Sequence, residues 1–192
     1  MKGAFVFLAD GFEETEALAT LDVLRRGGME VSTVSIDEEG FVTGSHGITV
    51  AVDKTWDDFM TDIRLGGTEK EDLMVFPGGM PGTKNLAAAE DLMALMVKHY
   101  EDGGTVAAIC AAPGLVASQL PGLEGKKFTC FDGFQEHMIA KGAEYVQAPA
   151  VVDGNLVTGR GAGCAIPFGL AILSHICGEE TAARVKHAMM ID

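Results

Sequence analysis

The chain has 192 residues, of which 47% are hydrophobic, so it is long enough for one domain with a sizeable core and too apolar to be disordered. Its formal net charge of −14 argues against nucleic acid and anionic membrane surfaces as partners, because phosphate groups are bound by basic faces. No apolar run approaches the length of a membrane-spanning helix, so we expect a cytoplasmic protein.

Short apolar runs alternate with helical patterns along the whole chain. This alternation is typical of an α/β protein in which helices cover both faces of a mostly parallel sheet. Ligands of such folds bind beyond the carboxyl ends of the strands. The runs that predict strands are 2–8, 29–36, 73–76, 105–109, 128–130, 146–152 and 156–158, with a small hairpin over 41–50; the patterns that predict helices are 14–27, 90–100, 112–118, 134–141, 167–177 and 180–190.

Three glutamates follow the first predicted strand, within the segment 9–16. Acidic side chains are favourable at helix starts, and Glu13 is expected to be a solvated loop or cap residue. Glu16 lies beside Ala17 and Ala19, so its carboxyl is expected to point inward along the carboxyl edge of the sheet. A carboxyl in a partly apolar cleft has a raised pKa and stays protonated, which lets it donate a hydrogen bond to a thiolate.

A glycine turn, Pro77-Gly78-Gly79, ends the strand expected over 73–76. Glycine permits close approach of the backbone and positive φ, so this turn suits an oxyanion hole, with N–H groups from Gly79 and Ala111. By itself, however, Pro-Gly-Gly is most often only a turn.

Cys110 follows the strand 105–109 directly, and small residues and a helical pattern come after it. A reactive side chain at a sharp strand-to-helix turn is a nucleophile elbow. The helix expected over 112–118 would direct its free N–H groups at the sulfur and lower the pKa of the thiol. The alternative is a buried cysteine that acts as a small hydrophobe. The other cysteines form no C-x-x-C pair and are not expected to form disulfides.

Arg160 lies among glycines in the segment 158–164, after the last predicted strand. Its guanidinium either approaches a small anion or belongs to a flexible surface loop, and the sequence leaves both open. His99 and His187 are expected on helix surfaces, and His175 in the core. No group of histidines, cysteines and carboxylates has metal-ligand spacing, so no metal is expected.

At these motifs the chain resembles the ThiJ/PfpI superfamily of the class I glutamine amidotransferase-like fold, and within it the subgroup of the Parkinson-disease-associated deglycase. The similarity covers essentially all of residues 1–192, as one ThiJ/PfpI-type domain. It is carried by the segments 8–16, 22–26, 77–79, 85–86, 107–111 and 160–163.

The resemblance implies a flavodoxin-like three-layer sandwich that forms a homodimer and needs no cofactor. It also implies roles for single residues. Cys110 would be the nucleophile or redox centre, and Glu16 its protonated partner. Gly79 and Ala111 would supply backbone donors, and Arg160 would belong to an anion pocket.

Some positions depart from the family pattern. Ala111 stands where the peptidases of the superfamily carry a histidine, so peptidase and amidotransferase activities are not expected. Cys130 stands where many deglycase-type members have a histidine near the active cysteine, and His46 takes the place of a family arginine. Cys130 and His46, together with Gly78 and Arg160, are expected around the anion or substrate pocket.

The first functional hypothesis is therefore a glyoxalase- or deglycase-type enzyme in which Cys110 adds to a small reactive aldehyde such as methylglyoxal. The alternative is a cysteine-based oxidative-stress sensor or chaperone-like protein without substantial turnover. A role in thiamine thiazole-phosphate biosynthesis has no physical support, since the chain lacks a phosphate-binding P-loop.

Overall fold

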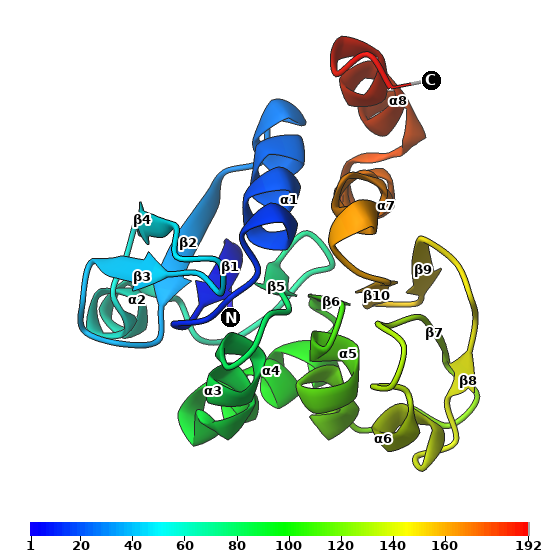
Figure 1. Ribbon diagram of the computed structural model, residues 1–192, viewed down its shortest axis with the longest axis horizontal. Coiled ribbons are helices and arrows are strands. Elements are labelled where there is room, and N and C mark those ends of the chain that lie inside the picture. The colour runs from blue at the N-terminus through cyan, green and yellow to red at the C-terminus, as the bar shows by residue number, and fades with distance from the viewer. Residues whose placement is uncertain (192) are drawn as a thin grey trace.

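The computed structural model describes residues 1–191, and its centre is a six-stranded sheet in the order β2-β1-β5-β6-β10-β9 (Figure 1). The first five strands in this order run parallel, and β9 pairs antiparallel with β10 at the edge. Two small sheets flank it. The strands are β1 (Ala4–Leu8), β2 (Val31–Ser35), β5 (Leu73–Phe76), β6 (Thr105–Ile109), β9 (Ala150–Asp153) and β10 (Leu156–Gly159) of the main sheet, the hairpin β3 (Phe41–Thr43) and β4 (Thr49–Ala51), and the parallel pair β7 (Lys127–Phe128) and β8 (Glu144–Tyr145).

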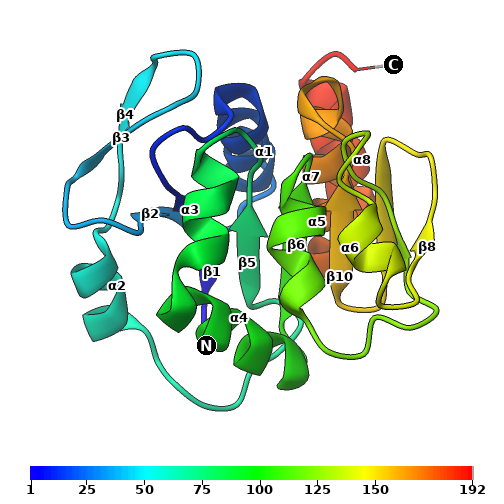
Figure 2. The ribbon, with the colours of Figure 1, turned by 60° about the horizontal axis from the view of Figure 1, so that its bottom comes forward.

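Helices cover both faces of this sheet, as Figures 1 and 2 show, so the predicted α/β three-layer sandwich is confirmed. None of the described helices is long and apolar enough to cross a membrane. One layer contains α1 (Glu14–Arg26), α7 (Ala165–Cys177) and α8 (Glu179–Ala188), and the other contains α3 (Gly82–Ala88), α4 (Glu90–Glu101), α5 (Ala112–Leu115) and α6 (Glu136–Ile139), while α2 (Trp56–Asp62) lies beside β2.

Alternation of side chains along the buried strands builds a separate core on each face. In β1, Phe5 and Phe7 pack with Phe59 of α2 on one side. Val6 and Leu8 belong to the second core, beneath α1 and α7. Because successive residues of a strand point to opposite faces, a fully apolar strand indicates a sheet buried on both sides.

The structure departs from the predicted elements where they are short. The sequence pattern does not predict α2 or α3. Instead of the strand expected over 128–130, the structure has the two-residue strand β7 (Lys127–Phe128), which pairs with β8 outside the main sheet. The helix expected over 112–118 ends at Leu115 after one turn, and a separate 3-10 turn, Ala117–Gln119, follows. Gly114 inside this segment is a poor helix former, which explains the early break.

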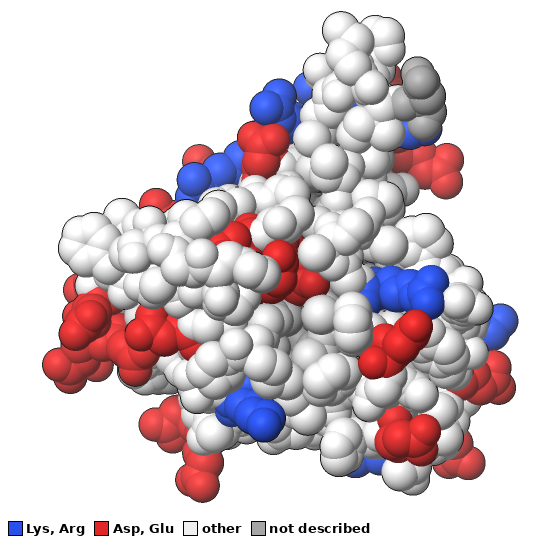
Figure 3. Space-filling model, in the orientation of Figure 1, with Lys and Arg blue, Asp and Glu red and all other residues white. Residues whose placement is uncertain are grey.

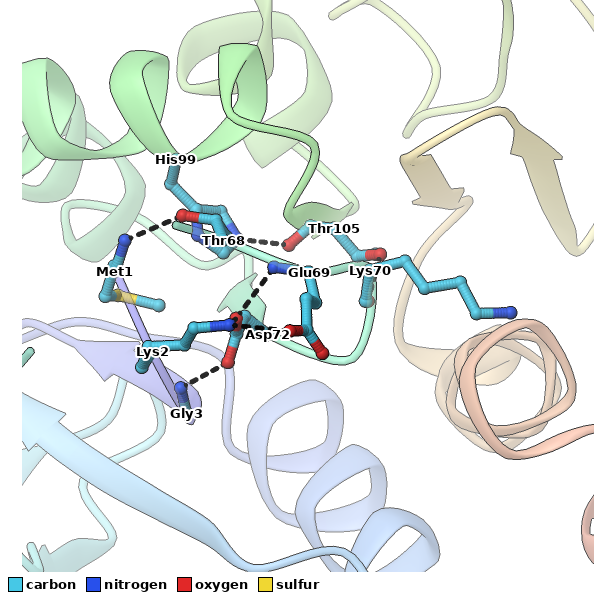
Figure 4. A network of polar contacts seen from close by, with 9 residues as sticks. All are labelled: Met1, Lys2, Gly3, Thr68, Glu69, Lys70, Asp72, His99 and Thr105. Atoms are coloured by element: carbon cyan, nitrogen blue, oxygen red, sulfur yellow. Dashed lines mark hydrogen bonds and ion pairs between the residues drawn. The ribbon is translucent and has the colours of Figure 1, made fainter. Parts of the chain in front are cut away.

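A polar network ties the amino ends of β1 and β5 together, at the edge opposite Cys110 (Figure 4). Asp72 is buried, and its carboxylate accepts hydrogen bonds from Gly3 N–H at 2.7 Å and Glu69 N–H at 2.9 Å. Lys2 Nζ lies 3.1 Å from the same carboxylate. Burial raises the pKa of Asp72, but these donors outweigh it and lower the value.

The prediction that His99 lies on a helix surface is wrong. Its side chain is fully buried, and Nε2 donates to the carbonyl of Thr105 at 3.0 Å, at the start of β6 (Figure 4). Gly104 makes room for the ring, because a Cβ at that position would collide with it. His187 is exposed, as expected, whereas His175 is half-buried rather than in the core.

Candidate active site around Cys110

β6 carries Cys110 to the carboxyl edge of the sheet and then turns sharply. Its φ of 67° makes it one of two non-glycine residues with positive φ among residues 1–191. The Cys110 N–H donates to the carbonyl of Gly159 at 2.9 Å, and its own carbonyl accepts from Phe131 N–H at 2.8 Å. These neighbouring segments hold a conformation that costs an L-residue about 1–2 kcal/mol. The side chain is thereby turned out at the end of the strand, as the sequence predicts for an elbow.

Gly78, which follows β5, lies directly against the cysteine. A Cβ at Gly78 would lie 2.6 Å from Cys110 Cβ and 2.6 Å from Glu16 Oε2, so only glycine fits between them. The next residue, Gly79, has a φ of 90°, which few other residues adopt. The backbone N–H groups of Gly79 and Ala111 face the Cys110 sulfur and lower the pKa of its thiol, against the larger effect of burial.

Glu16 reaches the same sulfur from the first turn of α1. Its side chain is 1% exposed, Oε2 accepts from Gly78 N–H at 2.8 Å, and the carboxyl hydrogen-bonds with the Cys110 thiol. Its Oε1 is buried and lacks a further partner within residues 1–191. Glu13 caps the helix: its carboxylate accepts from Glu16 N–H at 2.7 Å, and its N–H donates to the carbonyl of Gly78. Glu13 is thus the cap residue that the sequence predicts.

The titration of this buried pair differs from the expectation. Burial raises the pKa of Glu16 to about 7, although hydrogen bonds from Gly78 and Cys110 oppose the rise. Burial also raises the pKa of the Cys110 thiol to about 12, and the charge of Glu16 adds to this, while Ala111 and Gly79 lower it. The predicted lowering of the thiol pKa is therefore wrong, because α5 is one turn long and its dipole is too small to offset burial. Between about pH 7 and about pH 12 the pair holds a single proton.

Arg160 follows β10 and lies beside a cleft of about 320 Å³. Its Nη2 donates to the carboxylate of Asp132 at 3.1 Å and 3.3 Å, and this pairing raises the pKa of the guanidinium. Phe131, which contacts the backbone of Cys110, and Cys164 line the same cleft. The structure thus places Arg160 in a pocket wall but gives it an acidic partner that the sequence pattern does not reveal.

His46 lies at the turn between β3 and β4, where its Nδ1 is 2.8 Å from Glu14 Oε2. Burial raises the pKa of Glu14, but hydrogen bonds from His46 and Ile48 outweigh it and hold the value at about 2. Glu13, Glu14 and His46 bring ligand atoms within 4.8 Å of one another, the one such group found in residues 1–191. Glu14 and His46 already satisfy each other, and the Glu13 carboxylate accepts Glu16 N–H as the cap of α1.

The prediction that Cys130 lines the pocket is not met. Its side chain is fully buried in the core beneath α5 and α6, and burial raises the pKa of its thiol to about 11. The next residue, Phe131, is half exposed and takes the place at the cleft. Successive residues of an extended segment point in opposite directions, so a shift of one position exchanges core and pocket.

The charged groups of the site share one face of the molecule. Figure 3 shows acidic side chains gathered near its centre, beside the β3–β4 hairpin, and a basic side chain with an acidic neighbour near the end of β10. The sequence analysis missed Glu14 and Asp132, since an acidic residue gives no sign of burial or of its partner.

Comparison with known proteins agrees with the family resemblance. A model of the DJ-1/PfpI family matches residues 2–175. Protein DJ-1 homolog A of Arabidopsis thaliana is 34% identical over 99% of this chain and 47% of its own length, so the chain spans about half of that relative. A deglycase of Pyrococcus horikoshii is 35% identical over 79% of this chain and 86% of its own. The structure of oxidized Toxoplasma gondii DJ-1 has a TM-score of 0.87, with 28% identity over 98% of this chain and 97% of that one.

Proposed function

The chain belongs to the DJ-1/PfpI family, and from this membership we propose that it is a cysteine-dependent, cofactor-independent enzyme of glyoxalase or deglycase type that acts on small reactive aldehydes such as methylglyoxal. One observation carries the proposal. The buried Glu16 carboxyl contacts the Cys110 sulfur, and the N–H groups of Gly79 and Ala111 face the same atom. The deglycase name of the Pyrococcus relative supports the reaction class.

The chemistry begins when the Glu16 carboxylate takes the proton of the Cys110 thiol and the sulfur adds to the aldehyde carbon. A carbon–sulfur bond forms, and the carbonyl oxygen takes the proton held by Glu16, giving a hemithioacetal. The Glu16 carboxylate then removes the proton from that carbon and returns it to the neighbouring ketone carbon, while the hydroxyl proton of the hemithioacetal passes to the ketone oxygen. One carbon is oxidised and its neighbour reduced, so no external redox partner is needed. The product is a thioester of a 2-hydroxy acid.

Water completes the cycle by hydrolysing the thioester. The carbon–sulfur bond breaks, a 2-hydroxy acid such as lactate leaves, and the thiol regains its proton. During addition and hydrolysis, negative charge develops on the oxygen of the reacting carbon. The N–H groups of Gly79 and Ala111, which face the sulfur, would stabilise that oxygen.

The test is loss of methylglyoxal and formation of lactate by the purified protein without glutathione. We expect Cys110→Ser and Glu16→Gln to lower the rate by at least about 100-fold, the scale of acid–base catalysis. Cys177→Ser, at an exposed thiol, is the matched control and should retain the rate. Deglycase activity is measured on a preformed adduct freed of aldehyde, because consumption of free aldehyde mimics it. Undiminished turnover in Cys110→Ser would contradict the proposal.

A second function, an oxidative-stress sensor, is favoured by the related Toxoplasma DJ-1 whose structure is described as oxidized. In this chain Cys110 is partly exposed, and the two backbone N–H groups and Glu16 would stabilise a sulfinate in place of the thiol. Low peroxide should then add two oxygens at Cys110, as read by mass spectrometry. Sulfinate formation together with negligible aldehyde turnover would favour the sensor over the enzyme.

We also propose that the protein is a homodimer, as the family resemblance implies. An apolar groove of about 240 Å³ between α1 and α7, lined in part by Ala19, Ile166 and Pro167, supports a contact with a second copy at this face. Sedimentation equilibrium should give twice the mass of 20.2 kDa, and Ala19→Arg should shift the protein to a monomer.

A further inference from the structure

The carboxylate of Glu14 is buried beneath the turn between β3 and β4. It lies in the first turn of α1 and is 5% exposed. Oε1 accepts the N–H of His46 at 2.7 Å and that of Ile48 at 3.4 Å. Oε2 lies 2.8 Å from His46 Nδ1 and accepts Ser45 Oγ–H at 3.5 Å. A single side chain of α1 therefore fixes a turn that lies more than 30 residues further along the chain.

The same turn also holds the loop that connects β1 to α1. Gly11 N–H donates to the carbonyl of Thr43 at 2.7 Å, and Ser45 N–H donates to the carbonyl of Phe12 at 2.7 Å. Gly44 packs so closely on the Glu14 carboxyl that a Cβ there would collide with it. These contacts hold the hairpin and the loop against each other.

This piece is attached directly to the reactive pair. Glu13, next to Glu14, donates its N–H to the carbonyl of Gly78 and accepts Glu16 N–H with its carboxylate. Glu16 in turn contacts the Cys110 sulfur. The contact between His46 and Glu14 is therefore connected to the Cys110 sulfur through the first turn of α1, which carries both Glu14 and Glu16.

We propose that Glu14 and His46 are a positioning pair, and that loss of the proton from His46 weakens the reactivity of Cys110. The charged groups that face the imidazole are Glu14 of α1 and Glu13, the N-cap residue of that helix; among residues 1–191 no lysine or arginine faces it. While His46 is charged, it balances the carboxylate of Glu14 and holds the turn in place. Once His46 is neutral, the negative charge of Glu14 is no longer compensated in the helix turn that carries Glu16, and it disfavours the Cys110 thiolate.

The direction of the effect follows from the pairing. The hydrogen bond and the charge of Glu14 raise the pKa of His46 above its ordinary value, so the imidazolium persists to higher pH than in an isolated histidine. As the pH rises through the pKa of His46, the reactivity of Cys110 should then fall below that of a protein with a permanent cation at position 46. The effect is modest, because the imidazole is exposed to water.

The experiment measures the rate of iodoacetamide labelling at Cys110 by intact-mass spectrometry from pH 6 to pH 9. His46→Arg supplies a fixed charge, His46→Gln supplies none, and His187→Gln is the matched control at an exposed histidine of α8. We expect the wild type to match His46→Arg at low pH and to fall about two- to five-fold below it at high pH. His46→Gln should lie at the lower level throughout, and His187→Gln should follow the wild type.

Equal labelling rates of the wild type, His46→Arg and His46→Gln at every pH would overturn the inference. It rests on the proposed role of Cys110 as the reactive thiol but not on turnover. If Cys110 labels readily without any dependence on position 46, only the inference fails; if Cys110 never labels, the proposed function fails with it. A histidine titration by NMR adds a second reading: Glu14→Gln should lower the pKa of His46 toward its ordinary value, and an unchanged pKa would contradict the pairing.

Discussion

Replacing Glu16 with glutamine decides which member of the buried pair holds the shared proton. Below about pH 7 both groups are protonated, and above about pH 12 neither is. Between these values the reactivity of Cys110 depends on whether the sulfur or the carboxyl carries the proton. We expect the sulfur to carry it, since burial and the charge of Glu16 raise the pKa of the Cys110 thiol to about 12, whereas the pKa of Glu16 is raised only to about 7.

The two protonation states predict opposite effects of the substitution. With the proton on sulfur, a thiol with a pKa of about 12 is ionised in about one molecule in 10⁴ at pH 8. With the proton on Glu16, most molecules carry a thiolate at that pH. Glutamine removes the charge of Glu16, which contributes to the raised thiol pKa, so this pKa falls from about 12 toward the ordinary 9.0. Labelling of Cys110 should therefore become faster, by at most about 10³-fold.

The assay is the rate of iodoacetamide labelling at pH 8, read at Cys110 by mass spectrometry in a background that carries Cys164→Ser and Cys177→Ser. Glu13→Gln is the matched control, because it removes a charge from the same helix turn without touching the sulfur. Circular dichroism verifies that each variant is folded. Slower labelling of Glu16→Gln than of the parent would place the proton on Glu16 and refute the reasoning.

Three further predictions concern packing, stability and binding. Gly78→Ala should lower the free energy of unfolding by about 1–3 kcal/mol in denaturant titration, because its methyl group overlaps the reactive thiol, whereas Gly163→Ala, in open space, should not. Burial lowers the pKa of His99, so below pH 6.5 the imidazole takes up a proton in the unfolded chain but not in the folded one. The free energy of unfolding should therefore fall by up to about 1.4 kcal/mol for each unit that the pH is lowered below 6.5, and His99→Asn should weaken this pH dependence. Asp132→Asn should release Arg160 from its ion pair and lower the KM for aldehydes that carry a carboxylate about two- to five-fold, relative to the KM for methylglyoxal. If the ratio of the two KM values does not change, Arg160 does not contact the substrate.

Much of the fold follows from the sequence because alternation and strand ends are local properties. The runs 73–76 and 105–109 match β5 and β6 residue for residue. Their carboxyl ends bring the Gly78 turn and Cys110 together, as parallel strands require. Short elements are harder. α2 and the single turn of α5 depend on packing against the sheet rather than on a periodic pattern long enough to recognise.

The sequence pattern also does not predict in which direction side chains point at the ends of helices and strands. Cys130 and Phe131 are neighbours, yet one is in the core and the other lines the cleft. His99 sits between charged residues and is nevertheless fully buried, because Gly104 leaves space for its ring. Such positions are set by contacts between segments, which neither composition nor spacing encodes.

The three glutamates at the start of α1 show how far environment outweighs residue type. Glu13 is a helix cap, Glu14 has a pKa of about 2, and Glu16 has a pKa of about 7, within a single helix turn. Glu14 and Glu16 are both hidden from solvent, so exposure of the side chain does not separate them. What separates them is the supply of donors: Glu14 receives two backbone N–H groups and an imidazole, whereas Glu16 receives one N–H and leaves Oε1 without a partner. A buried carboxyl short of donors is stabilised by binding a proton, and Glu16 can therefore accept the proton that Cys110 must lose to react.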